Sequence, residues 1–507
     1  MNLTDSDIRE RMIGCWLGKA VGGTLGQPYE GRVQTKNAGP LALTYYDPVP
    51  ESMMPNDDLD LQVVHAVKLK QLADRGELRI DCRAMAEIWR HIGMSPGEYG
   101  ACKRNLALGL APPTTGAYDN PMQIGMGAAI RSELWACLAP CEPDRAARMA
   151  EHDACMDHAG AGVDAARFLA ALEAMAFVEH DLNALLDGAL TCLDPKTELC
   201  VAMQRTREWF AEGHDWRTIR SLIFDYHGKD DFTDVRTNLP FIVLGLLEGC
   251  RDGRINFGRA ICTAVNCGMD TDCTGATVGA ILGIIDPHCI EDRWLKPIGR
   301  NLVLMDAVLN IHPPSTIDDF TDLVVDLRDA IGPDMPPPPP PREPTEHLAI
   351  PAQTAIVDAM PPCNEPLAWP RDGHRTTLPG QWAAWPAGDV VAKTLLIRYR
   401  ITIPDDVTGP VRLAFASPQA RRAWWDGECV VDVPAGPYIP VLHYGPREQL
   451  TDIPAAPGRH ELILALAAPP DAEGDRLEWC IMLGQPNPHH GSPNHLPFAF
   501  ERLGDDQ

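Results

Sequence analysis

The chain has 507 residues, with 44 Lys and Arg against 70 Asp and Glu, which gives a formal net charge of −26. Hydrophobic residues make up 45% and charged residues 22%, a composition typical of folded proteins and not of disordered ones. The acidic excess argues against a nucleic-acid-binding surface and against an anchor on an anionic membrane, because both need a local positive potential.

The sequence contains no run of about 18 or more apolar residues, the length that a membrane-spanning helix needs. Its first residues include Asp5, where a signal peptide would be basic and then apolar, so we expect a cytoplasmic location. The 16 cysteines are spread from Cys15 to Cys480 without the spacing of a zinc finger. Most of these thiols are expected to be small buried side chains.

The first unusual segment, residues 14–30, is rich in glycine. Gly14, Gly18 and Gly22 recur every four residues and therefore share one helix face, where a second backbone can approach closely. The pattern favours close helix packing. Glu30 follows a proline at the end of this segment and is either structural or part of a site.

The second segment, Asn56-Asp57-Asp58, precedes an amphipathic helix with apolar residues at helical spacing. Asn and Asp at a helix start commonly accept hydrogen bonds from unpaired backbone amides and complement the helix dipole. Taken alone, the segment is best interpreted as such a cap.

The third segment carries Asp270 and Asp272 just before an apolar helix of small residues, Gly275 to Ile285. Because that helix is expected to be buried, its start and the two carboxylates should lie inside the protein. Buried carboxylates need compensation, most simply by a hard divalent cation. Two acid pairs, each opening a helix, can converge on a two-metal site with oxygen ligands.

Six consecutive prolines, Pro336 to Pro341, mark the clearest boundary, because such a run adopts an extended polyproline II conformation. Before it, long helical patterns such as 164–178 and 260–285 predict an all-α domain. After about residue 365, alternating apolar residues in 395–403, 411–415 and 462–466 predict strands of a jelly-roll β-sandwich. We therefore expect an all-α domain over 1–334, a proline-rich linker over 335–364 and a β-sandwich over 365–507.

In combination, the three segments resemble the ADP-ribosylglycohydrolase family, which includes the dinitrogenase-reductase-activating glycohydrolases. Residues 124–131 and 152–158 agree with this resemblance, which covers roughly residues 8–330. The resemblance implies an orthogonal helical bundle that binds two Mg²⁺ ions in a cleft and hydrolyses a ribosyl C1 bond. Carboxylate and amide oxygens suit Mg²⁺, and Mn²⁺ is a second possibility.

The resemblance also implies roles for particular residues. Asn56, Asp57 and Asp58 would form one group of metal ligands, and Asp270 and Asp272 the other. Glu30 would lie near the sugar, and Glu30 or Asp58 would take a proton in catalysis. Gly125, Met126 and Gly127 would form a loop that approaches the phosphates or the distal ribose of the substrate. His158 would lie near the cleft.

Three positions depart from the family pattern. Asn56 and Cys273 stand where the family usually has threonine, and Lys19 stands where an acid is frequent. A thiol is a poor Mg²⁺ ligand, and Thr274 would replace Cys273 only if the helix start shifted. These departures bear more on the identity of the substrate than on the type of reaction.

The predicted β-sandwich resembles galactose-binding-like domains in its strand pattern and its Trp-Asp-Gly turn. We expect most of its six tryptophans in the core, but Trp424 and Trp425 should point to opposite faces, which would leave at least one exposed or at an interface. Arg421 and Arg422 would be available to a carboxylate or a phosphate. The domain would bind a glycan, cover the cleft or form an oligomer interface.

The sequence thus predicts a metal-dependent glycoside hydrolase that acts on an ADP-ribosyl-type substrate, either a small molecule or a protein-linked glycoside. One alternative is a hydrolase of another furanoside or nucleoside-like glycoside, with the β-sandwich contributing to carbohydrate recognition. Another is a non-catalytic protein that binds ADP-ribose or a glycan. The four predicted carboxylate ligands, Asp57, Asp58, Asp270 and Asp272, favour an enzyme, because without a cation they repel one another.

Overall fold

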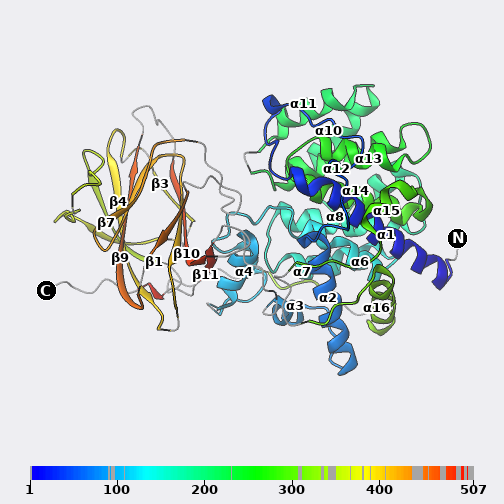
Figure 1. Cartoon of the computed structure of the whole chain (residues 1–507), viewed down its shortest axis with the longest axis horizontal. Coiled ribbons are helices and arrows are strands. Elements are labelled where there is room, and N and C mark those ends of the chain that lie inside the picture. The colour runs from blue at the N-terminus through cyan, green and yellow to red at the C-terminus, as the bar shows by residue number, and fades with distance from the viewer. Residues whose placement is uncertain are drawn as a thin grey trace. The chain divides into compact units, whose positions relative to one another are not determined.

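The computed structural model describes residues 3–89, 92, 97–107, 109–229, 231–305, 311–332, 336–340, 350–365, 367–378, 382–386, 388, 390–405, 407–436, 449–454, 456–468, 476–486, 493–495 and 499–500. The chain divides into two compact units, one helical and one built around β-sheets (Figure 1). Among the described helices, none is long and apolar enough to cross a membrane.

The first unit is helical, as the sequence predicted. The helices of the chain are α1 (Asp5–Gly26), α2 (Asp57–Asp74), α3 (Cys82–Trp89), α4 (Gly97–Ala107), α5 (Thr114–Ala117), α6 (Ser132–Leu138), α7 (Pro143–Ala154), α8 (Ala161–Ala176), α9 (Leu182–Leu190), α10 (Glu198–Ala211), α11 (Trp216–His227), α12 (Val235–Cys250), α13 (Phe257–Asn266), α14 (Thr271–Ile285), α15 (Asp292–Ile298) and α16 (Ile317–Ala330). Short 3₁₀ segments are η1 (Gln27–Tyr29), η2 (Lys36–Ala38), η3 (Ala129–Arg131) and η4 (Pro287–Cys289).

Side-chain caps set the starts of several helices. Thr4, Thr197, Asp215 and Thr316 each accept a backbone N–H in the first turn of α1, α10, α11 and α16. Such caps satisfy amides that have no partner inside the helix.

Helices α1 and α14 lie against each other along their length, which confirms the close packing predicted from the glycines (Figure 1). A Cβ atom on Gly18 would lie 2.0 Å from the Gly279 carbonyl oxygen, and one on Gly22 would lie 1.9 Å from that of Gly275. At the end of the contact, the Thr271 hydroxyl donates to the Gly26 carbonyl oxygen at 2.8 Å. The pair therefore brings the end of α1 to the start of α14.

The described part of the proline run, residues 336–340, has no helix or strand. Its first carbonyl oxygen, that of Pro336, lies 2.7 Å from Nε2 of His152 in α7. The run therefore starts in contact with the helical unit.

The second unit contains two antiparallel sheets. Its strands are β1 (Ile350–Val357), β2 (His374–Leu378), β3 (Trp382–Pro386), β4 (Thr394–Ile403), β5 (Val411–Ala416), β6 (Ala420–Trp425), β7 (Glu428–Val433), β8 (Leu450–Ile453), β9 (Gly458–Ala467), β10 (Arg476–Pro486), β11 (Pro493–His495) and β12 (Ala499–Phe500). One sheet has the order β2-β1-β4-β9-β6-β7, with β12 also paired to β4, and the other has the order β11-β10-β5-β8, with β3 paired to β10.

The two sheets share one apolar core. Leu395, Ile397, Tyr399, Ile401 and Ile403 of β4 pack there with side chains of β5 and β10, so the alternation seen in the sequence points these residues inward. Strand β1 lies inside the range 335–364 that was expected to be a linker, so the sheets begin earlier than the pattern suggested. Helix α4, although part of the range 1–334, groups with this unit and contacts β11 (Figure 1).

The prediction that Trp424 or Trp425 would be exposed is wrong. The two side chains do point to opposite faces, but Trp425 packs in the core between the sheets and Trp424 in a second cluster. Met360, Leu367 and Trp369 cover that second cluster from outside the strand. An alternating pattern predicts the two faces of a strand, but it carries no information about a segment that covers the outer face.

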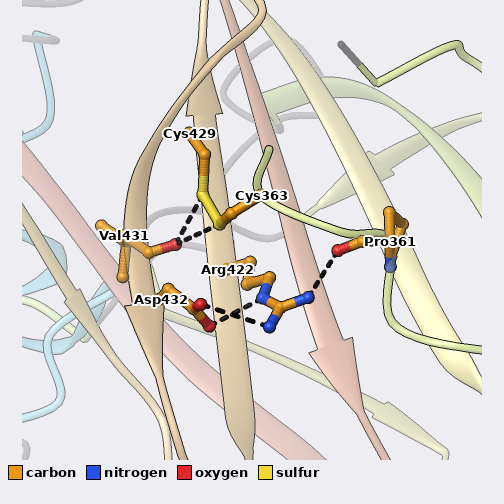
Figure 2. The surroundings of a disulfide bond; sticks show 6 residues. All are labelled: Pro361, Cys363, Arg422, Cys429, Val431 and Asp432. Carbon is orange, nitrogen blue, oxygen red and sulfur yellow. Dashed lines mark hydrogen bonds and ion pairs between the residues drawn. A yellow bond between two sulfur atoms is a disulfide. The ribbon is translucent and has the colours of Figure 1, made fainter. Parts of the chain in front are cut away.

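A disulfide joins Cys363 to Cys429 at the start of β7 (Figure 2). Nearby, Arg422 pairs with Asp432, with Nε and Oδ1 2.6 Å apart, and donates to the Pro361 carbonyl oxygen (Figure 2). Arg421 is buried and donates to the carbonyl oxygens of Phe415 and Ser417. Both arginines therefore bind partners within the unit.

Candidate metal and substrate site

The starts of helices α2 and α14 carry the predicted ligands, and neither start is capped in the ordinary way. Asn56 and Asp270 occupy the N-cap positions of α2 and α14, yet neither side chain accepts a capping hydrogen bond. Asn56 therefore holds the N-cap position that the sequence predicted, with acids in the first turn of α2, but its side chain does not accept the expected capping hydrogen bond. Both side chains are therefore available to bind a group other than the helix backbone.

Carboxylates from three segments come together at these helix starts. Asp58, Asp272 and Cys273 offer ligand atoms that all lie within 4.8 Å of one another, and so do Glu30, Asp270 and Asp272. Asp272 belongs to both groups. We call the four acids Glu30, Asp58, Asp270 and Asp272 the carboxylate cluster.

The two remaining predicted ligands lie beside this cluster. The Asn56 amide nitrogen would be 2.9 Å from a Cβ atom on Gly23, so it faces α1. Burial raises the pKa of Asp58 and of Asp272, and Asp57 is close enough that its charge adds to both effects. Glu30 is half-buried, whereas Asp58, Asp270 and Asp272 are buried.

The electrostatics of the cluster fit a bound cation. Burial raises the pKa of Asp270, and the charges of Asp272 and Glu30 add to the effect. Burial and the charge of Asp57 raise the pKa of Asp272 to about 6. Oδ1 of Asp270 and Oδ1 of Asp272 are buried and have no hydrogen-bond partner among the described residues. Buried oxygens without a partner are costly, and a hard divalent cation would satisfy them.

Lys19, which departs from the family pattern, places a positive charge beside the carboxylate cluster. Its buried Nζ lies 2.8 Å from Oε1 of Glu133 and 3.4 Å from Oδ1 of Asp58. These two acids outweigh the effect of burial and raise the pKa of Lys19. Sequence reasoning missed Glu133, because it lies 114 residues from Lys19 in a buried helix with no motif of its own.

Cys273 is the residue that occupies the family's threonine position. Its thiol donates to Oδ2 of Asp58 at 3.7 Å, and burial raises its pKa well above the usual range, so it stays a neutral donor. The Thr274 hydroxyl donates to the Thr271 carbonyl oxygen within the helix. Cys273, and not Thr274, therefore contacts the carboxylate cluster.

The residues predicted to contact the substrate form a second group. Gly125, Met126, Gly127 and His158 are all buried. Arg131 donates to the Gly127 carbonyl oxygen at 2.5 Å and pairs with Asp157, which lies 3.0 Å from Nδ1 of His158. In the sequence, Arg131 is only the last residue of the segment 124–131, and the structure places it at the centre of this group.

Gln62 of α2 connects the two groups. Its amide nitrogen donates to the carbonyl oxygens of Asp58 and Ile130 and to the Glu133 carboxylate, at 2.9 to 3.1 Å. Its amide oxygen accepts the Leu134 N–H at 2.7 Å. The backbone that carries Arg131 is therefore fixed to the helix turn that carries Asp58.

Replacing Asp153 by asparagine is expected to lower the free energy of unfolding by about 3 kcal/mol at pH 7, because a buried ion pair loses one charge. Asp153 accepts from Nε of Arg131 at 2.8 Å, and Arg131 and then His65 outweigh burial and hold its pKa below the usual range. A lowered pKa stabilises the fold above the unfolded-state pKa, and this contribution is lost as the pH falls. The difference from wild type should therefore shrink below about pH 4.

Urea unfolding at several pH values would measure the difference in free energy of unfolding between Asp153→Asn and wild type. Asp144→Asn, at the exposed start of the same helix, is the matched control and should change stability by about 0.5 kcal/mol or less. An Asp153→Asn effect that is equally large at pH 7 and at pH 3 would contradict the pairing.

Comparison with known proteins adds the following. A model of the ADP-ribosylglycohydrolase family matches residues 4–329. A solved structure titled "ADP-ribosylglycohydrolase-related protein complex" is 20% identical, covers 64% of this chain and 99% of its own chain, and aligns with a TM-score of 0.42. No curated protein matches.

Proposed function

This chain belongs to the ADP-ribosylglycohydrolase family and is a hydrolase of glycosidic bonds, and from that premise we propose that it cleaves a ribosyl C1 bond of ADP-ribosyl type. The observation that carries the proposal is that Asp272 belongs to both ligand groups and has a buried oxygen without a hydrogen-bond partner among the described residues.

We further propose that the carboxylate cluster and the neighbouring Asn56 and Asp57 form a site for two Mg²⁺ ions, with Mn²⁺ as a substitute. The residues that would hold them are Asn56, Asp57, Asp58, Asp270 and Asp272. When bound, such ions would bind the vicinal ribose hydroxyls and lower the pKa of a water molecule near C1.

The side chains of the chain itself would then have separate tasks. Glu30 is the half-buried member of the cluster, and it would take a proton from the attacking water. Lys19 and the Cys273 thiol both donate to Asp58 and would orient it, and the Lys19 charge opposes the burial that raises the pKa of Asp58. The buried negative charges would favour the oxocarbenium-like transition state of glycoside hydrolysis.

Binding of the distal part of the substrate is proposed for the second group. Gly125, Met126 and Gly127 would present backbone to the phosphates or the distal ribose, and Arg131 holds Gly127 in place. His158, paired with Asp157, would border the cleft.

Adding Mg²⁺ to metal-free protein is expected to raise the melting temperature by about 5 °C, because at a hundredfold excess over Kd a bound ligand stabilises by about 2.7 kcal/mol. Scanning fluorimetry with Mg²⁺, Mn²⁺ and EDTA would measure it, with NaCl at matched ionic strength as the control. No shift with either cation would count against the metal site.

A second candidate function is hydrolysis of another furanoside or of a nucleoside-like glycoside. Cys273 in place of threonine favours it, because a neutral thiol bound to Asp58 changes the ligand set beside the sugar. In that case the β unit would assist carbohydrate recognition, for which the half-buried Trp369 and Trp385 remain candidates.

One substrate screen separates these candidates. ADP-ribosylated peptide, nucleosides and nitrophenyl furanosides would be incubated with the protein and Mg²⁺ or Mn²⁺. Release of ADP-ribose supports the first candidate, and turnover of the furanosides or nucleosides alone supports the second. Turnover of none of these substrates would contradict both candidates.

A further inference from the structure

Two cysteines and a histidine meet at the junction of helices α3 and α7, outside the carboxylate cluster. The Cys82 Sγ atom lies 3.6 Å from the Cys155 Sγ atom and 3.4 Å from Nδ1 of His152. Cys82 is 8% exposed and Cys155 is 4% exposed. Because both residues are nearly buried, a small molecule can reach Cys82 more readily than a large one. Neither thiol has a part in the proposed hydrolysis.

The surroundings of Cys82 favour its thiolate. Cys82 is the first residue of α3, where the backbone N–H groups and the helix dipole stabilise a negative charge. The hydrogen-bond contact with the Cys155 thiol, opposed by burial and aided by His152, lowers the pKa of Cys82 to about 6. The same contact and burial raise the pKa of Cys155, so Cys82 is the more acidic thiol of the pair.

We propose that Cys82 and Cys155 are a redox-active thiol pair, which a peroxide oxidises to a reversible disulfide between α3 and the end of α7. The sulfur atoms need to approach by about 1.5 Å to reach bonding distance, a movement of two side chains. The chain separation of 73 residues means that the bond would tie together two distant parts of the helical unit.

The chemistry proceeds in two balanced steps. The Cys82 sulfur attacks one peroxide oxygen, the O–O bond breaks, and the released hydroxide takes up a proton to leave as water while Cys82 becomes a sulfenic acid. The Cys155 sulfur then attacks the Cys82 sulfur, the S–O bond breaks, and the departing hydroxide leaves as a second water with the Cys155 proton. The two sulfurs together lose the two electrons that reduce the peroxide.

The position of Cys155 connects this pair to the proposed substrate group. Cys155 lies between Asp153, which pairs with Arg131, and Asp157, which contacts His158. Its own N–H donates to the Glu151 carbonyl oxygen at 3.1 Å, so a shift of Cys155 toward Cys82 acts on the last turn of α7. Oxidation is therefore expected to alter substrate binding, an effect that rests on the proposed function, whereas formation of the disulfide does not.

The test treats the full chain with hydrogen peroxide, blocks free thiols, and identifies linked peptides by mass spectrometry. The expected result is a Cys82–Cys155 linked peptide that dithiothreitol removes. In Cys155→Ser protein, Cys82 should instead be trapped as a sulfenic acid by dimedone. Cys262, whose pKa burial raises to about 12, is the internal control and should stay reduced.

Failure to find the linked peptide, or oxidation of Cys262 to the same extent, would overturn the redox pair. For the effect on substrate, we expect KM in the oxidised protein to change by about fivefold or more, a typical coupling between two sites. Cys82→Ser protein treated in the same way should show no change. If the disulfide forms and KM is the same in both redox states, the coupling is wrong, and if neither state turns over any substrate, the proposed function fails while the disulfide stands.

Discussion

Replacing Asp272 by asparagine is expected to lower kcat by on the order of 10³-fold, because a metal site supplies several kcal/mol of transition-state stabilisation and each 1.4 kcal/mol is tenfold in rate. Asp272 belongs to both ligand groups, and its Oδ1 atom has no hydrogen-bond partner among the described residues. Asparagine keeps the shape of the side chain and removes its charge. The rise of the melting temperature with Mg²⁺ should disappear as well.

The melting temperature of the metal-free variant distinguishes a metal ligand from a structural acid. Burial raises the pKa of Asp272, which means that the charged form is unfavourable in the fold without a cation. Metal-free Asp272→Asn protein should therefore be at least as stable as metal-free wild type. Asp74→Asn, at the exposed end of α2, is the control and should leave kcat and the Mg²⁺ response unchanged. An Asp272→Asn variant with wild-type turnover and an intact Mg²⁺ response would exclude the site.

The sequence predicted which segments carry the cluster because each has a local signal. Asn56-Asp57-Asp58 and Asp270-Thr271-Asp272 both open helices, and the apolar residues that follow them place the helix starts inside the protein. A buried acid at a helix start is locally recognisable, so these residues could be found before any fold was known. The convergence of the two starts could be expected only from the resemblance to a family.

Partners distant in the chain could not be predicted in the same way. Glu133 compensates Lys19, and Asp153 and Asp157 compensate Arg131, yet none of these residues has a neighbour in sequence that signals the pairing. The same holds for the disulfide between Cys363 and Cys429, which was not expected. Charge pairing and disulfide pairing depend on tertiary packing, which the hydrophobic period of one helix or strand does not encode.

The contact between the two glycine repeats could be predicted from the sequence only in part. The repeat of Gly14, Gly18 and Gly22 predicted a close contact without its partner, which is the matching repeat of Gly275, Gly279 and Gly283 in α14. Both repeats have a spacing of four residues, so each forms a strip on one helix face that is slightly inclined to the helix axis. The partner can be predicted only by asking which other helix carries a strip of equal length.

Replacing Gly18 by alanine is expected to lower the free energy of unfolding by about 3 kcal/mol, the upper part of the usual range for overpacking. The new Cβ atom would lie 2.0 Å from the Gly279 carbonyl oxygen and 2.5 Å from its carbonyl carbon, which are backbone atoms that no rotamer change can move. Helix α1 must then move away from α14. Glu30 follows α1 and Asp272 lies in the first turn of α14, so the Mg²⁺ response should weaken together with stability, as measured by urea unfolding and by melting with added Mg²⁺.

Gly188→Ala in helix α9 provides the matched control. Its Cβ atom would lie 2.3 Å from Cε and 2.8 Å from Sδ of Met175, the far end of a flexible side chain that can rotate away. Because alanine is favoured over glycine inside a helix by about 1 kcal/mol, this variant should be neutral or more stable than wild type. The same substitution is thus expected to have opposite signs at the two positions. Equal effects at Gly18 and Gly188 would mean that α1 and α14 are not held in backbone contact, and the alignment of Glu30 with Asp272 would then need another cause.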